Sequence, residues 1–362
     1  MFLREVTFGD YTKIKKLVTK SKKNIQDYET WKKIWSTNPL LKEGYKISLG
    51  WIIEKNQEVV GYLGNFPKVL KHNDKEYLAS CITTWVVDDQ YRSVSILLIN
   101  QFFNQKEIDI FICTTAKSAV NKIWKALGAM EMPLVSCQEV EFVILNSKKF
   151  INGYIKKKFN LPNFFTYLFI LLFKMTFIHK LNFRHFSKIN HNYKILDRVD
   201  EDIHAFLKKI DANNYRIKEN KNKDWLSWNI ERRILDKEVW SVKIFDKNSI
   251  IGYCLCIGEN LRHINLKKVY LADLEILNEN NTEAFKDLIK ISILESKKRN
   301  YDVIEFKNLN NYKKKYLKKF NFFKRKFKNN PYLYKFQENS KNFTYQDQDL
   351  WDISLLDGDN LF

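Results

Sequence analysis

Glycine is scarce in this chain, with 10 residues among 362, and the glycine-dependent motifs of nucleotide and hydrolase sites are absent. There is no GxGxxG, GxxxxGKS/T or GxSxG, which argues against a Rossmann dinucleotide site, a P-loop and an α/β-hydrolase nucleophile. The zinc motifs HExxH and CxxC are missing too. None of the six histidines has a partner at a spacing typical of a catalytic dyad. We therefore expect neither nucleotide nor zinc hydrolysis, and no metal site.

Cysteine is also rare: the chain has five, scattered along its length. An odd, scattered set in a long chain is not a disulfide framework. Cys254 and Cys256 stand two apart in an apolar run, so on a strand they would share one face, where we expect them to pack in the core. The first ten residues include acids and no apolar signal core. These features predict a cytoplasmic protein.

The length of 362 residues predicts two domains, and 45% hydrophobic with 29% charged residues is a globular composition. The net charge of +20 is concentrated in two places. Residues 142–196 contain ten Lys or Arg and no acid, and residues 306–337 contain eleven and no acid. The basicity is therefore local and needs local explanations.

The first basic stretch surrounds a nearly continuous apolar run, 164–178. A helix of this length would measure about 23 Å, short of the roughly 30 Å hydrocarbon core of a bilayer, so we do not expect a transmembrane span. Two interpretations remain. The run is a helix buried between two halves of the protein, or it lies in a membrane interface, where flanking lysines favour anionic headgroups. The second interpretation predicts peripheral contact of 156–188 with the inner membrane face.

The second half of the chain repeats the first. The segment 55–62, KNQEVVGY, recurs at 247–253 as KNSIIGY with one residue deleted, in each case after an apolar stretch. Gly128 corresponds to Asn321 at an offset of 193, and both residues tolerate the left-handed conformation found at helix ends. Offsets between 189 and 193 across four separate elements predict two copies of one domain.

The expected organisation is a first domain at 1–150, a basic helical connector at 151–189, a second domain at 190–345 and a tail at 346–362. Each copy predicts helices, a hairpin, a long strand, a helix, a strand and a final helix. The long strand, helix and next strand are expected at 77–87, 93–105 and 108–114 in the first copy, and at 268–277, 283–298 and 302–306 in the second. This order predicts an α/β fold, an α+β mixed sheet in each domain, with helices on both faces.

Particular residues in this order resemble the GNAT acyltransferase superfamily. The segment 85–98, WVVDDQYRSVSILL, resembles the family's fourth strand, pyrophosphate loop and third helix, written V-x-P-x-Y-R-G-x-G-x-G-x-x-L-L. Residues 114–116 and 123–128 are similar to its coenzyme-binding fifth strand and following helix. The tail from Trp351 to Asp359 resembles tandem GNAT-like proteins associated with surface-polysaccharide assembly. The resemblance implies two tandem GNAT-like domains and an acyltransferase that uses acetyl-CoA or another acyl-CoA as co-substrate.

By this resemblance, seven residues of the first domain would bind the coenzyme. They are Gln90, Tyr91, Arg92, Ser93, Val94, Ser95 and Lys117. A helix N-terminus suits the diphosphate because its N–H groups and dipole attract anions; the alternative is an ordinary serine-capped helix with a solvated arginine. Trp124 stands where the family often has a tyrosine that protonates the departing thiolate. Indole cannot supply that proton, and we expect Trp124 to pack in the core. The second copy, with NENNT before an acidic helix start, lacks such a loop.

Acyl transfer to an amine needs a base and stabilisation of an oxyanion. Strand alternation places Asp273 and Glu275 on one face, and either is a candidate base; a solvated or salt-bridged carboxylate is the alternative. Asp357 and Asp359, in the tail, are candidates for binding a polar acceptor.

The leading hypothesis is a CoA-dependent N-acyltransferase, most simply an acetyltransferase, acting on a small-molecule amine such as an amino sugar or a lipid-linked sugar of a surface-glycan precursor. One alternative is a non-catalytic GNAT-like binding protein. Another is a relative of the FemAB peptidyltransferases, which take aminoacyl-tRNA. The basic stretch 313–328 suits RNA phosphates, but its lysines recur at helical spacing, as on a solvated helix face. We therefore do not expect nucleic acid as a partner.

Overall fold

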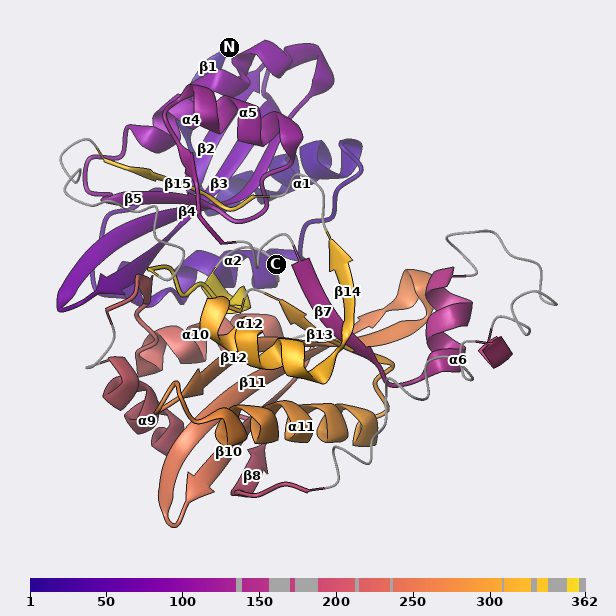
Figure 1. Ribbon diagram of the computed structural model, residues 1–362. Coiled ribbons are helices and arrows are strands. Elements are labelled where there is room, and N and C mark those ends of the chain that lie inside the picture. The colour runs from indigo at the N-terminus through magenta and orange to yellow at the C-terminus, as the bar shows by residue number, and fades with distance from the viewer. Residues whose placement is uncertain are drawn as a thin grey trace.

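The computed structural model describes residues 1–134, 139–155, 170–172, 188–211, 215–234, 237–307, 309–326, 331–337 and 350–357. These residues form two mixed sheets, one above the other in Figure 1. The strands are β1 (Phe2–Glu5), β2 (Gly50–Lys55), β3 (Glu58–His72), β4 (Lys75–Val87), β5 (Ile110–Cys113), β6 (Met130–Glu131), β7 (Glu139–Ile144), β8 (Asn192–Leu196), β9 (Lys218–Glu219), β10 (Glu238–Asp246), β11 (Ser249–Leu261), β12 (Leu266–Ile276), β13 (Val303–Lys307), β14 (Phe323–Lys326) and β15 (Leu333–Phe336). The α-helices are α1 (Tyr11–Lys20), α2 (Tyr28–Ser36), α3 (Pro39–Lys42), α4 (Ser95–Phe103), α5 (Ser118–Ala126), α6 (Ser147–Phe150), α9 (Glu201–Asp211), α10 (Lys223–Ile234), α11 (Thr282–Lys298) and α12 (Asn311–Leu317).

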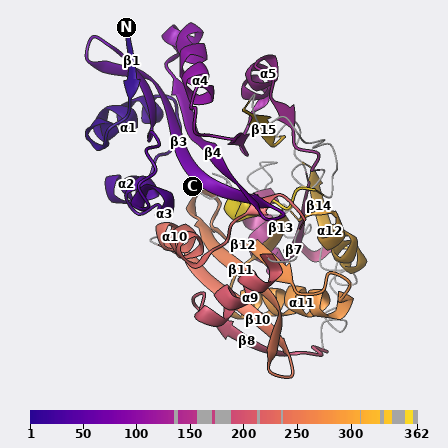
Figure 2. The same ribbon diagram turned by 90° about the vertical axis from the view of Figure 1, so that its left-hand side faces the viewer.

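The first sheet has the order β1-β2-β3-β4-β5-β15-β6, with β9 beside β3. Helices α1 and α2 cover one face and α4 and α5 cover the other (Figure 2). On α1 the buried residues Ile14, Leu17 and Val18 follow the helical period. On the other face Trp124 is fully buried against Phe102 and Phe103, which confirms its predicted place in the core.

The second sheet has the order β14-β7-β13-β12-β11-β10-β8. Helices α11 and α12 pack on one face, and α9 and α10 on the other. Cys254 and Cys256 are buried on β11, as predicted. Both halves have the expected hairpins, and Gly128 and Asn321 both adopt positive φ angles, of 84° and 50°. The predicted α/β fold with two mixed sheets is thus confirmed.

The two sheets exchange a strand. β7 follows β6 in the chain but lies in the second sheet, between β13 and β14. β15 returns from the second half and lies in the first sheet, between β5 and β6. The colours of Figure 1 show the exchange: magenta β7 lies among orange strands, and yellow β15 among purple ones. The predicted domain range 1–150 therefore contributes β7 to the second sheet, and the range 190–345 contributes β15 and the short β9 to the first.

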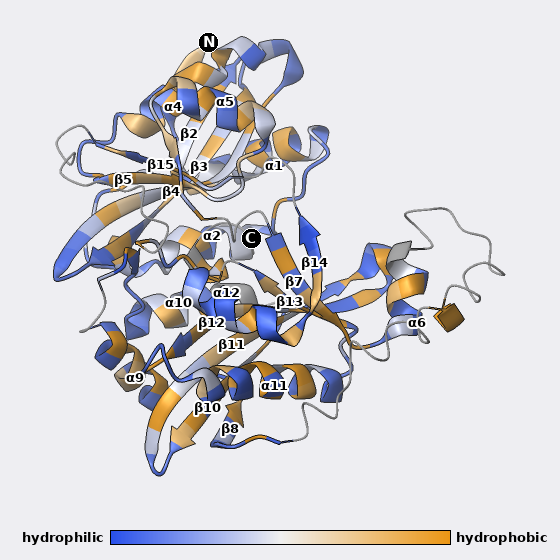
Figure 3. Ribbon diagram, viewed as in Figure 1, coloured by the Kyte–Doolittle hydropathy of each residue, from blue (hydrophilic) through white to orange (hydrophobic). Residues whose placement is uncertain are grey.

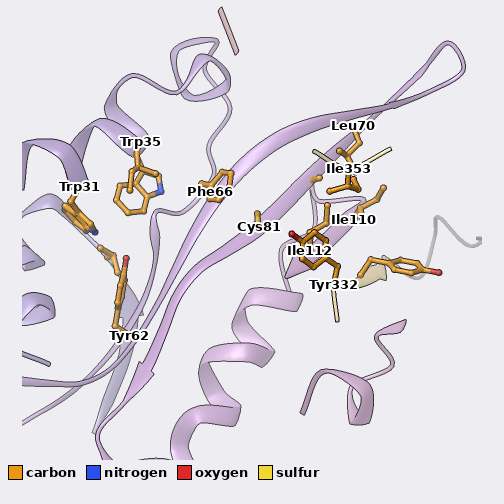
Figure 4. Packing of buried hydrophobic residues seen from close by; sticks show 14 of the residues in the cluster. Trp31, Trp35, Tyr62, Phe66, Leu70, Cys81, Ile110, Ile112, Tyr332 and Ile353 are labelled. Carbon is orange, nitrogen blue, oxygen red and sulfur yellow. The ribbon is translucent and has the colours of Figure 1, made fainter. Parts of the chain in front are cut away.

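The junction of the halves is packed with apolar side chains. Trp228 of α10 contacts Phe66 of β3, with ring centroids 6.2 Å apart. Ile353, from the C-terminal segment, lies beside Leu70 of the first half (Figure 4). Leu355, two residues later, belongs to the core of the second half. The C-terminal segment 350–357 therefore joins the two interiors.

The second basic stretch is matched by acids on neighbouring strands. β14 is hydrophilic along most of its length (Figure 3), and Lys324 lies 3.0 Å from Glu141 of β7. Arg325 lies 3.1 Å from Glu305 of β13. Much of the positive charge here is therefore neutralised within the sheet.

The apolar run 164–178 lies outside the described residues, apart from 170–172. Among the described helices, none is long and apolar enough to cross a bilayer.

Candidate functional site

The first sheet opens beside β4. β4 and β5 are parallel neighbours, but they pair only over residues 79–81 and 110–112. β4 then continues to Val87 beside β3 alone. The β3–β4 register shifts in this stretch, so that Thr83 and Thr84 face the single residue Gly64. Such a β-bulge bends a strand and increases its twist, and bulges are common next to active sites.

A cavity of about 960 Å³ lies at this end of β4. Its walls come from the end of α1, the end of β4 with the loop that follows, and the first turns of α5. The lining residues are Lys20, Ser21, Lys22, Lys23, Trp85, Val86, Val87, Asp88, Asp89, Gln90, Arg92, Ser95, Lys117, Ala119, Val120 and Ile123. Ligand pockets typically measure about 300–1,000 Å³, so the cavity is large enough for a cofactor-sized molecule.

Five basic side chains line the cavity. They are Lys20, Lys22, Lys23, Arg92 and Lys117. Two are neutralised by acids of the loop itself: Lys20 lies 2.5 Å from Asp88, and Arg92 lies 2.7 Å from Asp89. In the described part of the chain, no carboxylate forms an ion pair with the other three. The cavity therefore has excess positive charge, which attracts an anionic ligand.

Lys23 and Lys117 lie close enough to influence each other. The Lys23 ammonium donates a hydrogen bond of 3.0 Å to the Trp85 carbonyl oxygen. Burial and the neighbouring positive charge of Lys117 lower the pKa of Lys23. Lys117 precedes the first residue of α5, and Ser95 begins α4. Two helix N-termini therefore add their partial positive charge to this wall.

The structure brings most of the predicted coenzyme-binding residues together. Gln90, Arg92, Ser95 and Lys117 line the cavity. Tyr91, with Gln90, lines an adjoining cavity of about 340 Å³. The remaining two predicted residues, Ser93 and Val94, belong to the same 3-10 helix, Asp89–Val94, but line neither cavity.

The sequence-based prediction missed the lysines that follow α1. Lys20, Lys22 and Lys23 line the cavity, and the available signal was the KSKK run at 20–23. Such runs are common at helix C-termini, where lysine complements the helix dipole. The sequence alone therefore could not assign them to a site.

Asp273 and Glu275 lie elsewhere, buried on β12 with exposures of 2% and 3%. The Lys221 ammonium lies 2.6 Å from the Asp273 carboxylate and 3.1 Å from that of Glu275. Lys313 lies 3.6 Å from Glu275 and 3.3 Å from Asp352 of the C-terminal segment. Both carboxylates are therefore salt-bridged, which was the alternative to a catalytic base. Asp273 and Glu275 are absent from the lining of both cavities.

The two carboxylates respond differently to burial. Burial raises the pKa of Asp273 to about 6, and its Oδ2 atom has no hydrogen-bond partner in the described structure. Burial also opposes ionisation of Glu275, but the charges of Lys313 and Lys221 outweigh it and lower the pKa of Glu275 to about 2. At neutral pH both groups are therefore ionised inside the protein.

The predicted tail residues are only partly described. Asp357 is the last residue of a 3-10 helix, Leu355–Asp357, of which the structure describes only the backbone at this position. Asp359 lies outside the described residues.

Comparison with known proteins identifies the fold. No family model matches the chain, and no curated protein matches it. A GCN5-related N-acetyltransferase from Anabaena variabilis ATCC 29413 is similar in structure, with a TM-score of 0.56 and 10% identity, covering 92% of this chain and 72% of that one. A Saccharomyces cerevisiae N-myristoyltransferase with bound myristoyl-CoA has a TM-score of 0.55 and 14% identity, covering 97% of this chain and 88% of that one.

A GCN5-related N-acetyltransferase from Kribbella flavida is similar to the same degree, with a TM-score of 0.56 and 10% identity, covering 93% of this chain and 71% of that one. At such identities the likeness concerns the fold, and the predicted link to surface-polysaccharide assembly stays a prediction. Since each match spans more than nine-tenths of the chain, the protein has the fold of the GNAT N-acyltransferases over most of its length.

Proposed function

We propose that the protein is a CoA-dependent N-acyltransferase whose acyl-CoA binds in the cavity at the end of β4. The observation that carries the proposal is the position of this cavity, where β4 leaves β5 and excess positive charge collects. The predicted coenzyme loop supplies one wall, through Gln90, Arg92 and Ser95. Structures of the same fold support the donor class, since one is an N-acetyltransferase and another is described with myristoyl-CoA bound.

The chemistry is aminolysis of a thioester. The amine nitrogen attacks the acyl carbonyl carbon, a C–N bond forms, the C–S bond breaks and CoA leaves as its thiolate, while a base takes the proton of the amine. The developing oxyanion needs hydrogen-bond donors held in place. The bulge at Thr83 and Thr84, where the β3–β4 ladder is interrupted, is the part of β4 best suited to turn a backbone N–H group towards the reacting carbonyl.

For the acceptor we propose the amine of a small polar molecule, in particular an amino sugar or a lipid-linked sugar of a surface-glycan precursor. Support comes from the resemblance of the tail to tandem GNAT-like proteins of polysaccharide assembly. The C-terminal segment that begins this tail lies at the junction of the two halves. Most of 156–188 lies outside the described residues, and peripheral membrane contact through this stretch stays a prediction.

Calorimetric titration with acetyl-CoA and longer acyl-CoAs tests the donor. We expect saturable binding, and release of free thiol that depends on added amine when amino sugars are screened as acceptors. Absence of binding to every acyl-CoA would overturn the proposal. Binding without turnover would favour the non-catalytic GNAT-like protein, and strongly salt-dependent tRNA binding would favour the FemAB-like alternative.

A further inference from the structure

Two lysines approach the cavity from opposite faces of the first sheet. Lys23 follows α1, which packs on one face. Lys117 precedes α5, which packs on the other face. They meet at the cavity, where the Lys23 ammonium is held by the Trp85 carbonyl oxygen. Residues far apart in the sequence thus contribute two ammonium groups to one cavity.

The acids of the cavity pair with other cations and not with Lys23 or Lys117. The two acids that line the cavity, Asp88 and Asp89, are engaged by Lys20 and Arg92. Lys23 and Lys117 have no such counter-charge among the described residues. Two like charges brought together without a counter-ion repel each other, and the lowered pKa of Lys23 reflects both its burial and that repulsion. An anion bound between the two ammonium groups would remove the repulsion.

We infer that Lys23 and Lys117 form an anion subsite that binds a phosphate group of the donor, separate from the loop at Asp89–Val94. The inference rests on the proposed function, because it takes acyl-CoA as the ligand of the cavity. It keeps Lys117 from the sequence-based expectation, adds Lys23, and does not depend on the charge of Arg92. In the structure Arg92 is engaged by Asp89, so the unpaired positive charge of the cavity, among the described residues, is that of Lys22, Lys23 and Lys117. Of these three, Lys23 and Lys117 adjoin helices on opposite faces of the sheet. CoA carries a diphosphate and a 3′-phosphate, and the subsite makes binding depend on one of them.

The test is calorimetric titration of CoA against Lys23→Gln, Lys117→Gln and the double variant. We expect the dissociation constant to rise about tenfold for each lysine, since hydrogen bonds to charged groups are among the stronger ones. Binding should also become less sensitive to salt. Lys122→Gln is the matched control: it removes the same charge from an exposed position on α5 that does not line the cavity, and it should bind CoA like the wild type.

Three truncated ligands identify the phosphate: dephospho-CoA, which lacks the 3′-phosphate; 4′-phosphopantetheine, which has one phosphate; and pantetheine, which has none. For the wild type we expect affinity to fall sharply at the step that removes the recognised phosphate, and for the double variant we expect that step to disappear. A double variant that binds CoA as tightly as Lys122→Gln does would overturn the subsite and leave the proposed function intact. Failure of the wild type to bind any acyl-CoA would overturn the proposed function itself.

Discussion

Both sheets contain two parallel neighbours that pair only briefly, after which the first strand continues beside its antiparallel neighbour alone. In the first half β4 pairs with β5 over residues 79–81, and in the second half β12 pairs with β13 over residues 268–271. Each long strand also has a register shift against the strand before it, opposite Gly64 in one case and at Ala272 in the other. The two halves therefore have the same backbone opening, as the predicted duplication implies.

The two openings are lined in opposite ways. Beyond the paired stretch of β4 lies the cavity with its free lysines. Beyond that of β12 lie Asp273 and Glu275, held by Lys221, Lys313 and, through Lys313, Asp352 of the C-terminal segment. The first half keeps charge available for a ligand, while the second satisfies its charges internally. The two halves thus share a backbone opening but differ in the charges that line it.

Removing Lys313, which pairs with two buried carboxylates of the second half, should have the largest effect on stability. Lys313→Met leaves Glu275 and Asp352 buried without this partner, and breaking a buried ion pair from one side costs about 3–5 kcal/mol. Urea denaturation should show a midpoint lowered accordingly. Lys315→Met, at an exposed position on the same helix, is the control and should change stability by less than about 0.5 kcal/mol. Equal midpoints for the two variants would contradict the structural role of the cluster.

A smaller effect should appear in the pH dependence of stability. The folded-state pKa of Asp273 is about 6, above the ordinary value of about 3.9. Between about pH 4 and pH 6 the Asp273 carboxyl is therefore protonated in the folded state and ionised in the unfolded state. The unfavourable contribution of this carboxylate is therefore present above pH 6 and fades as the pH falls towards about 4.

The stability of the wild type relative to Asp273→Asn should rise by about 2 kcal/mol between pH 7 and pH 4. Urea denaturation at several pH values measures this difference. Asp246→Asn, at an exposed position in the β10–β11 hairpin, should show no such trend relative to the wild type. A parallel pH profile for wild type and Asp273→Asn would show that burial does not perturb this group.

The order of elements could be predicted because its signals are local. The turn between β2 and β3 has positive φ angles at Asn56 and Gln57, and the KN pairs marked both hairpins. The strand exchange could not be predicted in this way: β7 and β15 are apolar enough to be strands, but their sheets are decided by pairing between distant segments. Local pattern determines that a strand forms, and tertiary contacts determine its neighbours.

The site shows the same limit. The loop at Gln90 and Arg92 could be found because it follows a strand and begins a helix, an order visible in the sequence. Lys117 was expected at the coenzyme site from the family resemblance, but its pairing with Lys23 could not be predicted, since it depends on the segments after α1 and before α5 meeting at the end of β4. Likewise the acids that neutralise β14 lie on β7 and β13, so counting charge along the chain overstated the basicity of that region.

The smallest effect on stability is expected from the ion pair in the loop that follows β4, which can be compared with the pair made by the loop that follows β12. In the second half, the loop residue Glu279 is bonded to Arg216, whose side chain is 6% exposed. In the first half, the Arg92–Asp89 pair is fully on the surface, at 76% and 82% exposure, where ion pairs contribute little.

Arg92→Gln should therefore leave the urea midpoint unchanged within about 0.5 kcal/mol and weaken CoA binding by no more than about threefold, well below the loss for the lysine double variant. Arg216→Gln, by contrast, leaves Glu279 without its buried partner and should destabilise the fold by about 1–3 kcal/mol. Each substitution removes an arginine that pairs with an acid of one of these loops, Asp89 in the first half and Glu279 in the second. If Arg92→Gln abolished CoA binding, the loop rather than the lysine subsite would supply the charge that recognises the donor, and the first half would bind through the segment that the sequence already marked.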